Sequence, residues 1–239
     1  MTPNTQLPPF LFLDLDDTIV AYTDSGKQCW QKVVQEFAPQ LDLSPETFLT
    51  GLNRTSNEYW SDPERHRIGR QDLRGSRRVV LGLTFEHLGL PASPLSSQIA
   101  DAFTDMREEM FYLFEGAVPA LEAFKQQGIR LAMLTNGNAV RQRAKIEKFK
   151  LAAYFDLIII ESEFGIGKPD HRVFLHALET MGATPGITWM VGDDLMRDLQ
   201  PADQLGMQTV WIDCEKSGLP PDRPVTPTHS LHSLAELIL

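Results

Sequence analysis

The chain has 239 residues, which is enough for one or two domains with a sizeable buried core. Hydrophobic residues make up 42% and charged residues 23% of it, and this excludes disordered, collagen-like and low-complexity proteins. Asp and Glu total 32 against 22 for Lys and Arg, a formal net charge of −10. An excess of negative charge disfavours nucleic-acid polymers and anionic membrane surfaces as partners.

The sequence has two cysteines, Cys29 and Cys214, which lie far apart and cannot by themselves make a disulfide framework or a closed zinc site. The opening residues carry neither the basic nor the apolar region of a secretory signal. Every apolar stretch is much shorter than the roughly 20 residues that span a bilayer. We therefore expect a cytoplasmic protein that is a monomer or a homodimer.

Five short apolar runs, four of them ending in polar residues, predict strands along the chain. They are Phe10–Leu13, Ile129–Leu134, Leu157–Ile160, Trp189–Val191 and Thr209–Ile212. Helical patterns lie between the later runs, at 120–127, 141–150, 172–181 and 199–205. Alternation of continuous apolar strands with helices predicts an α/β fold with a parallel sheet covered on both faces, in which ligands bind at the carboxyl ends of the strands.

Residues 21–112 interrupt this alternation and read as helices, at 27–37, 45–57, 69–88 and 96–114. The sequence therefore predicts an all-helical domain over 21–112. It is inserted into a discontinuous core made of residues 1–20 and 113–239.

Two carboxylates follow the first predicted strand, at Asp14 and Asp16. If they converge on one point, their repulsion is on the order of 4 kcal/mol at ~4 Å and an effective dielectric near 20. A divalent cation would offset it, and oxygen-only ligands favour Mg²⁺. Asp14 could then act as a nucleophile and Asp16 as an acid and base. The alternative is a capped turn, where Asp is common.

Polar residues also follow three later segments. Thr135 and Asn136, before Gly137, have side chains suited to binding phosphoryl oxygens. A Gly/Pro loop carries Lys168, but Pro169 stands where a Walker A motif needs Ser or Thr.

The third segment, at the end of the Trp189–Val191 run, supplies Asp193 and Asp194, with Asp198 four residues later. These carboxylates are further oxygen ligands for a cation. Asp198 could instead hold Lys168 in place.

These four clusters, in this order, resemble the signature motifs of the haloacid dehalogenase-like hydrolase superfamily, over roughly residues 8–20 and 113–239. The resemblance implies a Rossmann-like core and phosphoryl transfer through a phospho-aspartate. It implies Asp14 as the nucleophile and Asp16 as the general acid and base. Lys168, Thr135 and Asn136 would hold the phosphoryl group.

The same resemblance implies Mg²⁺ held by the side chains of Asp14 and Asp193 and by the backbone carbonyl of Asp16. Asp194 stands where the family often has Ser, and with Asp198 it would support the site. The helical insert would be a type-one cap over the site, which favours small phosphorylated metabolites as substrates.

Phosphatase chemistry is the preferred reading because dehalogenases of the superfamily lack the second acid, here Asp16. Phosphomutases and phosphotransferases keep both aspartates, so they remain an alternative. A 2-haloacid dehalogenase and an inactive binding module are less favoured alternatives.

The segment Thr135–Gly137 followed by Arg141–Ile146 is similar to the branch with pyrimidine-type nucleotidases and acylneuraminate phosphate phosphatases. A nucleoside monophosphate or a sugar phosphate is therefore the leading substrate. Within the insert, Arg70 and Arg74 belong to a basic cluster that could clamp an anionic substrate. The alternative is a solvated helix face paired with acidic residues.

Overall fold

A computed structural model describes residues 6–69 and 72–238. The chain forms two compact units. The first contains the chain up to Ala21 and again from Tyr112, and the second is Tyr22–Phe111, whereas the sequence places the divisions after residue 20 and before residue 113. Within the described residues no helix is long and apolar enough to cross a membrane.

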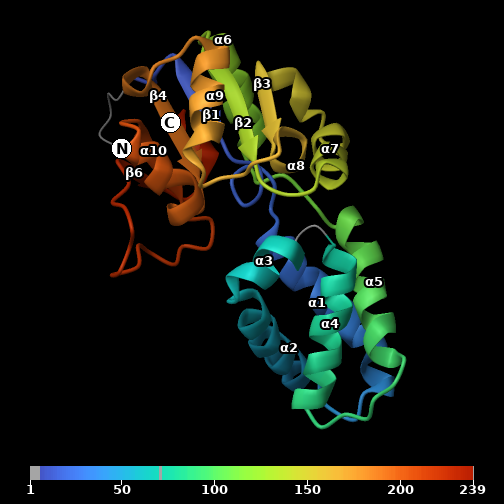
Figure 1. Ribbon diagram of the computed structural model, residues 1–239. Coiled ribbons are helices and arrows are strands. Elements are labelled where there is room, and N and C mark those ends of the chain that lie inside the picture. Colours follow the sequence, from blue (N-terminus) through green and yellow to red (C-terminus); the bar gives the residue numbers. More distant parts are fainter. Residues whose placement is uncertain (1–5, 70–71, 239) are drawn as a thin grey trace. The chain divides into compact units, whose positions relative to one another are not determined.

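The first unit contains a six-stranded, fully parallel sheet (Figure 1). Its strands are β1 (Phe10–Leu13), β2 (Arg130–Thr135), β3 (Leu157–Ile160), β4 (Thr188–Gly192), β5 (Gln208–Ile212) and β6 (His229–Leu231). Five strands are those that the apolar runs predict. The sequence did not predict β6, because it is a three-residue edge strand without an apolar run.

The strand order is β3-β2-β1-β4-β5-β6, the doubly wound order of a Rossmann-like fold. Leu13 of β1 pairs with Met133 of β2 on one side and with Val191 of β4 on the other. The order reverses between β1 and β4. Such a reversal opens a crevice at the carboxyl ends of the strands, where ligands bind in this class of sheet. The predicted α/β class with a parallel sheet is confirmed.

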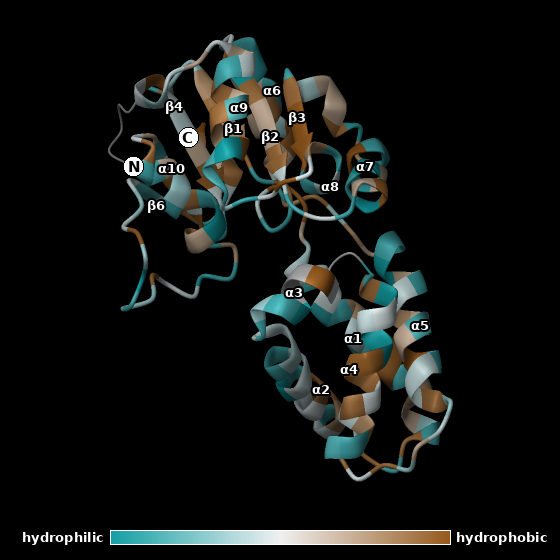
Figure 2. Cartoon of the chain, in the orientation of Figure 1, coloured by the Kyte–Doolittle hydropathy of each residue, from teal (hydrophilic) through white to brown (hydrophobic). Residues whose placement is uncertain are grey.

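Helices and short helical turns connect these strands, and one further turn, η5, follows the last of them. They are α6 (Ala117–Gln126), α7 (Ala139–Lys148), η2 (Leu151–Tyr154), α8 (Glu161–Phe164), α9 (His171–Met181), η3 (Pro185–Ile187), the π-helical turn η4 (Leu195–Leu199), α10 (Gln200–Gln204) and η5 (Leu234–Leu237). Figure 2 shows the central strands in the brown of hydrophobic residues. Phe12, Leu134 and Met190 pack with Phe174 and Ala177 of α9 in one buried cluster. Burial of such side chains is the main stabilising contribution in this unit, at about 1.5–3 kcal/mol each.

The second unit is wholly helical in its described residues. It consists of α1 (Thr23–Phe37), η1 (Ala38–Gln40), α2 (Pro45–Trp60), α3 (Pro63–Gly69), α4 (Leu73–His87) and α5 (Leu95–Glu109). The expected helix over 69–88 is in fact shorter, because Asp72 accepts a hydrogen bond from Gly75 N and begins α4 there. Likewise α5 ends at Glu109 and not at 114, and α3 was not predicted.

The helical unit has its own buried core. Phe48 of α2 lies edge-on to Phe85 of α4, with ring centroids 5.8 Å apart, and Trp30 of α1 stacks on Phe103 of α5 at 3.7 Å. Leu52, Leu81 and other aliphatic side chains complete the cluster. The unit therefore has the apolar interior that an independent domain requires.

The two chain segments at the division are paired within the first unit. Val20 forms an antiparallel bridge with Leu113, and Ala21 N donates a hydrogen bond to Tyr112 O at 2.9 Å. The chain therefore leaves the sheet unit and returns to it at neighbouring positions. An insertion at such a pair leaves the rest of the sheet undisturbed.

Candidate active site

Asp14 is the first residue after β1, at the centre of the sheet. Asp14 N donates to Val191 O at 3.0 Å, so the backbone of Asp14 continues the pairing of β1 with β4. The carboxylate is buried, with a side chain 9% exposed. Its Oδ1 accepts a hydrogen bond from Lys168 Nζ at 2.6 Å.

Lys168 lies between two carboxylates. Its Nζ is also 2.6 Å from Asp198 Oδ1, and the Lys168 side chain is only 3% exposed. Burial by itself would lower the pKa of Lys168, but the charges of Asp14 and Asp198 outweigh it and hold that pKa above its ordinary value. Lys168 is therefore a fixed cation at this end of the sheet. Of the two roles that the sequence leaves open for Asp198, the ion pair is the one observed.

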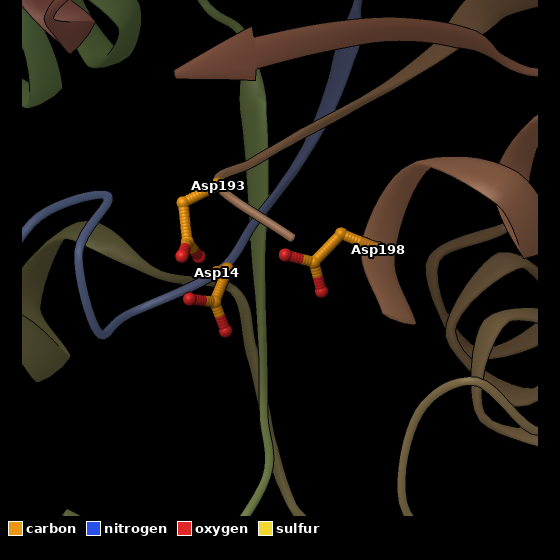
Figure 3. Close-up of side chains that lie close together, drawn as sticks. All are labelled: Asp14, Asp193 and Asp198. Atoms are coloured by element: carbon orange, nitrogen blue, oxygen red, sulfur yellow. The ribbon is translucent and has the colours of Figure 1, made fainter. Parts of the chain in front are cut away.

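Asp193 completes a group of three carboxylates. One carboxylate oxygen from each of Asp14, Asp193 and Asp198 lies within 4.8 Å of the other two (Figure 3). Burial and then the charge of Asp14 raise the pKa of Asp193 well above its ordinary value. Burial also raises the pKa of Asp14, to about 7, while Lys168 opposes that shift. If all three carboxylates are ionised, the single ammonium of Lys168 cannot balance their charge, which favours the binding of a further cation.

Gly192 makes room for this arrangement at the end of β4. A Cβ atom at Gly192 would lie 2.3 Å from Asp198 Oδ2, which is far inside contact distance. Asp194 has a different task, because its side chain accepts hydrogen bonds from the backbone N of Met196 and Arg197, both at 2.9 Å. Asp194 thus starts the turn that carries Asp198.

Asp16 does not join the three-carboxylate group. The chain coils after Asp14, since Ile19 N and Val20 N both donate to Leu15 O at 2.9 Å. The Asp16 carboxylate instead accepts from Lys145 Nζ, at 2.6 Å for Oδ1 and 2.7 Å for Oδ2. The Asp14 and Asp16 carboxylates are thus paired with different lysines, Lys168 and Lys145. The charge of Asp16 is still one of the causes that raise the pKa of Asp14.

Thr135, the last residue of β2, is buried, and its Oγ1 accepts from Gln142 Nε2 at 2.6 Å. Asn136 makes two hydrogen bonds to the backbone of Lys168: Nδ2 donates to the carbonyl at 2.7 Å and Oδ1 accepts from N at 2.8 Å. The Asn136 amide therefore holds the loop that carries Lys168. The Gly137 N–H, part of the turn expected to bind phosphoryl oxygens, donates to Glu161 Oε2 at 2.8 Å.

Two arginines of the helical unit, Arg74 and Arg78, pair with acidic residues. Arg70 lies outside the described residues. Arg74 forms ion pairs with Asp101, at 3.1 Å, and with Asp105. Arg78 pairs with Asp101 at 2.8 Å. This is the arrangement of a solvated helix face, the alternative that the sequence leaves open.

Sequence reasoning missed Gln142 and Lys145. They lie in a segment of α7 that is mostly polar, where burial of a lysine is unexpected. Their spacing of three residues, which places them on one helix face, was a usable signal, but the sequence alone does not show which face is buried.

Comparison with known proteins identifies the family. Residues 10–206 match the family model for haloacid dehalogenase-like hydrolase. An N-acylneuraminate-9-phosphatase of Mus musculus is 34% identical over 95% of this chain and 91% of that protein. The pyrimidine 5'-nucleotidase YjjG of Escherichia coli is 30% identical over 95% of each chain.

Among solved structures, the HAD-hydrolase YfnB of Bacillus subtilis bound to magnesium has a TM-score of 0.75 at 20% identity, over 97% of each chain. That similarity shows the shared fold. The family match covers most of the chain, and the two sequence relatives match it over almost their whole length. The chain belongs to the haloacid dehalogenase-like hydrolases, and these two relatives within that family are phosphatases.

Proposed function

We propose that this hydrolase is a phosphatase that transfers a phosphoryl group from a small metabolite first to Asp14 and then to water. The observation that carries the proposal is the contact of Asp14 with Lys168, 2.6 Å long, at the carboxyl end of the central strand. A nucleophilic carboxylate and a buried cation are brought together where a parallel sheet of this order binds ligands. The names of the two sequence relatives support the same chemistry.

The carboxylate group fits a divalent cation. Asp14, Asp193 and Asp198 offer only hard oxygen donors, within 4.8 Å of one another, and one ammonium leaves part of their charge uncompensated. Such donors select Mg²⁺ over softer metals. We propose that the side chains of Asp14 and Asp193 and the carbonyl of Asp16 hold Mg²⁺. When bound, the cation neutralises charge on the phosphoryl oxygens and on the attacking carboxylate.

The chain's own residues then account for both steps. A carboxylate oxygen of Asp14 forms a bond to phosphorus while the bond from phosphorus to the alkoxy oxygen breaks, and Asp16 donates a proton to that oxygen. Asp16 next accepts a proton from water, which attacks phosphorus, releases inorganic phosphate and restores Asp14. Lys168 and Thr135 bind the phosphoryl oxygens, and Asn136 keeps Lys168 in place through its backbone.

The proposed substrate is a nucleoside monophosphate or a sugar phosphate. One relative is named as a nucleotidase and the other as a phosphatase of a phosphorylated sugar acid. We propose that the helical unit Tyr22–Phe111 is a cap domain that restricts the enzyme to small substrates. Arg74 takes no part in this proposal, since its guanidinium is paired with Asp101 and Asp105.

We also propose that the protein works in the reducing cytoplasm, which agrees with two cysteines that are both free, Cys29 and Cys214.

A phosphate-release assay tests the function. We expect the protein with Mg²⁺ to release inorganic phosphate from small phosphate monoesters, and EDTA to abolish the release. A mutase given a bisphosphorylated sugar would instead return the phosphoryl group to a sugar hydroxyl, without net release of inorganic phosphate. Equal rates with Mg²⁺ and with EDTA would contradict the proposed cation.

A further inference from the structure

Helix α7 presents two buried polar side chains on one face. Gln142 is 3% exposed and the Lys145 side chain is 5% exposed. They are three residues apart, so they lie on the same side of the helix. Burying an ammonium group costs free energy unless an oppositely charged group pairs with it. The partner of Lys145 therefore indicates what this lysine does.

Both side chains meet Asp16. Lys145 Nζ contacts the two carboxylate oxygens at 2.6 and 2.7 Å, and Gln142 Nε2 donates to Oδ2 at 3.1 Å. The same Gln142 Nε2 donates to Thr135 Oγ1 at 2.6 Å. One helix thus makes three contacts with the Asp16 carboxylate and ties it to the end of β2.

This arrangement is separate from the lysine of the Asp14 group. Lys168 contacts Asp14 and Asp198, and Lys145 contacts Asp16. The Asp16 side chain remains 26% exposed, so it is held on one side and is open to solvent on another. A proton-transfer group needs this combination of a fixed position and an accessible oxygen.

We propose that Lys145 and Gln142 are positioning residues that hold the Asp16 carboxylate where it exchanges a proton with the leaving-group oxygen and with water. The inference rests on the proposed function, because it takes Asp16 as the general acid and base. Neither residue contacts the phosphoryl group in this scheme. Their effect on the reaction passes through Asp16.

The test compares leaving groups in the Mg²⁺-loaded enzyme. p-Nitrophenolate departs with little need for a proton, whereas the alkoxide of glycerol phosphate needs one. We expect Lys145→Met to lower kcat/KM for glycerol phosphate roughly 10²-fold and that for p-nitrophenyl phosphate less than tenfold. Gln142→Leu should also lower kcat/KM more for glycerol phosphate than for p-nitrophenyl phosphate, but the difference should be smaller than in Lys145→Met.

A double-variant comparison isolates the path through Asp16. Adding Lys145→Met to Asp16→Asn should produce no further loss, because the group that Lys145 positions is already gone. The matched control is Arg143→Met, which removes a cation of the same helix that pairs with Glu163 at 2.6 Å. It should leave both substrates within about twofold of the parent rates.

Three outcomes decide the matter. The positioning role is supported by a larger loss of kcat/KM for glycerol phosphate than for p-nitrophenyl phosphate and by no added loss in the double variant. A crystal structure of Lys145→Met should also show a displaced Asp16 carboxylate. Equal losses on both substrates, or an added loss in the double variant, overturns it while the proposed function stands. If Asp16→Asn itself fails to separate the two leaving groups, the role of Asp16 in the proposed function fails, and the inference fails with it. Should Lys145→Met not fold, Gln142→Leu carries the same comparison.

Discussion

At the scale of single residues, the site is defined by which lysine meets which aspartate. Asp14 and Asp198 share Lys168, and Asp16 has Lys145. Each of these contacts joins residues that are far apart in the chain and that are brought together by the fold. Pairing of buried charges in this way stabilises the charged form of each lysine, and removal of one partner leaves the other charge buried and uncompensated.

Lys168→Met tests this dependence in metal-free protein. The substitution leaves Asp14 and Asp198 buried without their cation, so we expect the free energy of unfolding to fall by about 3–5 kcal/mol near neutral pH. Loss of the ammonium raises the pKa of both carboxyl groups further in the folded state. The folded variant then binds more protons than the unfolded chain, so its deficit should shrink as the pH falls from 8 to 5.

Urea unfolding at several pH values measures this effect. A deficit that stays constant over the whole range would show that the two carboxylates do not depend on Lys168. Lys125→Met is a suitable control, since the Lys125 ammonium is exposed and donates to a backbone carbonyl, Ala153 O, at 2.5 Å.

Sequence reasoning reached most of these residues and offered the pair of Asp198 with Lys168 as one of two alternatives, but it did not predict the pair of Asp16 with Lys145. Asp14, Lys168 and Asp193 follow predicted strands or lie in a Gly/Pro loop, and the sheet topology brings them together. The motif spacing could not show that Asp16 pairs with Lys145 while Asp14 pairs with Lys168. The sequence did not predict the role of Lys145, because tertiary packing decides which face of α7 is buried.

At the scale of elements, apolar runs located five strands because most side chains of those strands are buried. The edge strand β6 lacked such a run and depends on its neighbours. His229 at its start lies beside Trp189, with ring centroids 5.2 Å apart, and its Nε2 is buried without a hydrogen-bond partner among the described residues. Burial lowers the pKa of His229 below its ordinary value of 6.5.

This shift predicts a pH dependence of stability. A depressed histidine pKa means that the unfolded chain binds a proton more readily than the folded one. His229 therefore favours unfolding as the pH falls from about 7 through 6.5 and below. We expect His229→Phe to reduce the loss of stability between pH 7 and pH 5, measured by urea unfolding.

His171→Gln serves as the comparison, because His171 is half-buried and its Nε2 has a hydrogen-bond partner, Gln204 Oε1, at 2.9 Å. It should leave the pH dependence close to that of the parent. An identical pH dependence of stability in His229→Phe and in the parent protein would show that burial of His229 does not destabilise the folded state at low pH.

At the scale of the whole molecule, one chain forms two units, each with its own hydrophobic core. The helical patterns over 21–112 predicted an insert, and its helices form their own buried cluster. Helix ends within the insert were less predictable, since they depend on local capping by residues such as Asp72. The pairing of Ala21 with Tyr112 shows that the insert begins and ends at one place in the sheet unit.

Replacement of residues 22–111 by a short Gly/Ser linker tests the role of the insert. Because Ala21 and Tyr112 are hydrogen-bonded at 2.9 Å, a few residues suffice to join them, and we expect the sheet unit to fold. The shortened protein should still hydrolyse p-nitrophenyl phosphate, though more slowly, because a cap excludes water from the transfer step.

Selectivity is the more telling readout of that experiment. Loss of the insert should raise the rate on a phosphopeptide relative to the rate on a nucleoside monophosphate. If the parent protein already hydrolyses both equally well, the insert does not restrict access and the cap proposal is wrong.

The central claim is that the phosphoryl group passes through the Asp14 carboxylate. The most direct measurement is rapid acid quenching of the Mg²⁺-loaded enzyme during turnover, then borohydride reduction and peptide mass spectrometry. An acyl phosphate is reduced to an alcohol, so we predict homoserine at position 14 and no turnover by Asp14→Asn. Homoserine at any other carboxylate, or an active Asp14→Asn variant, would contradict the account.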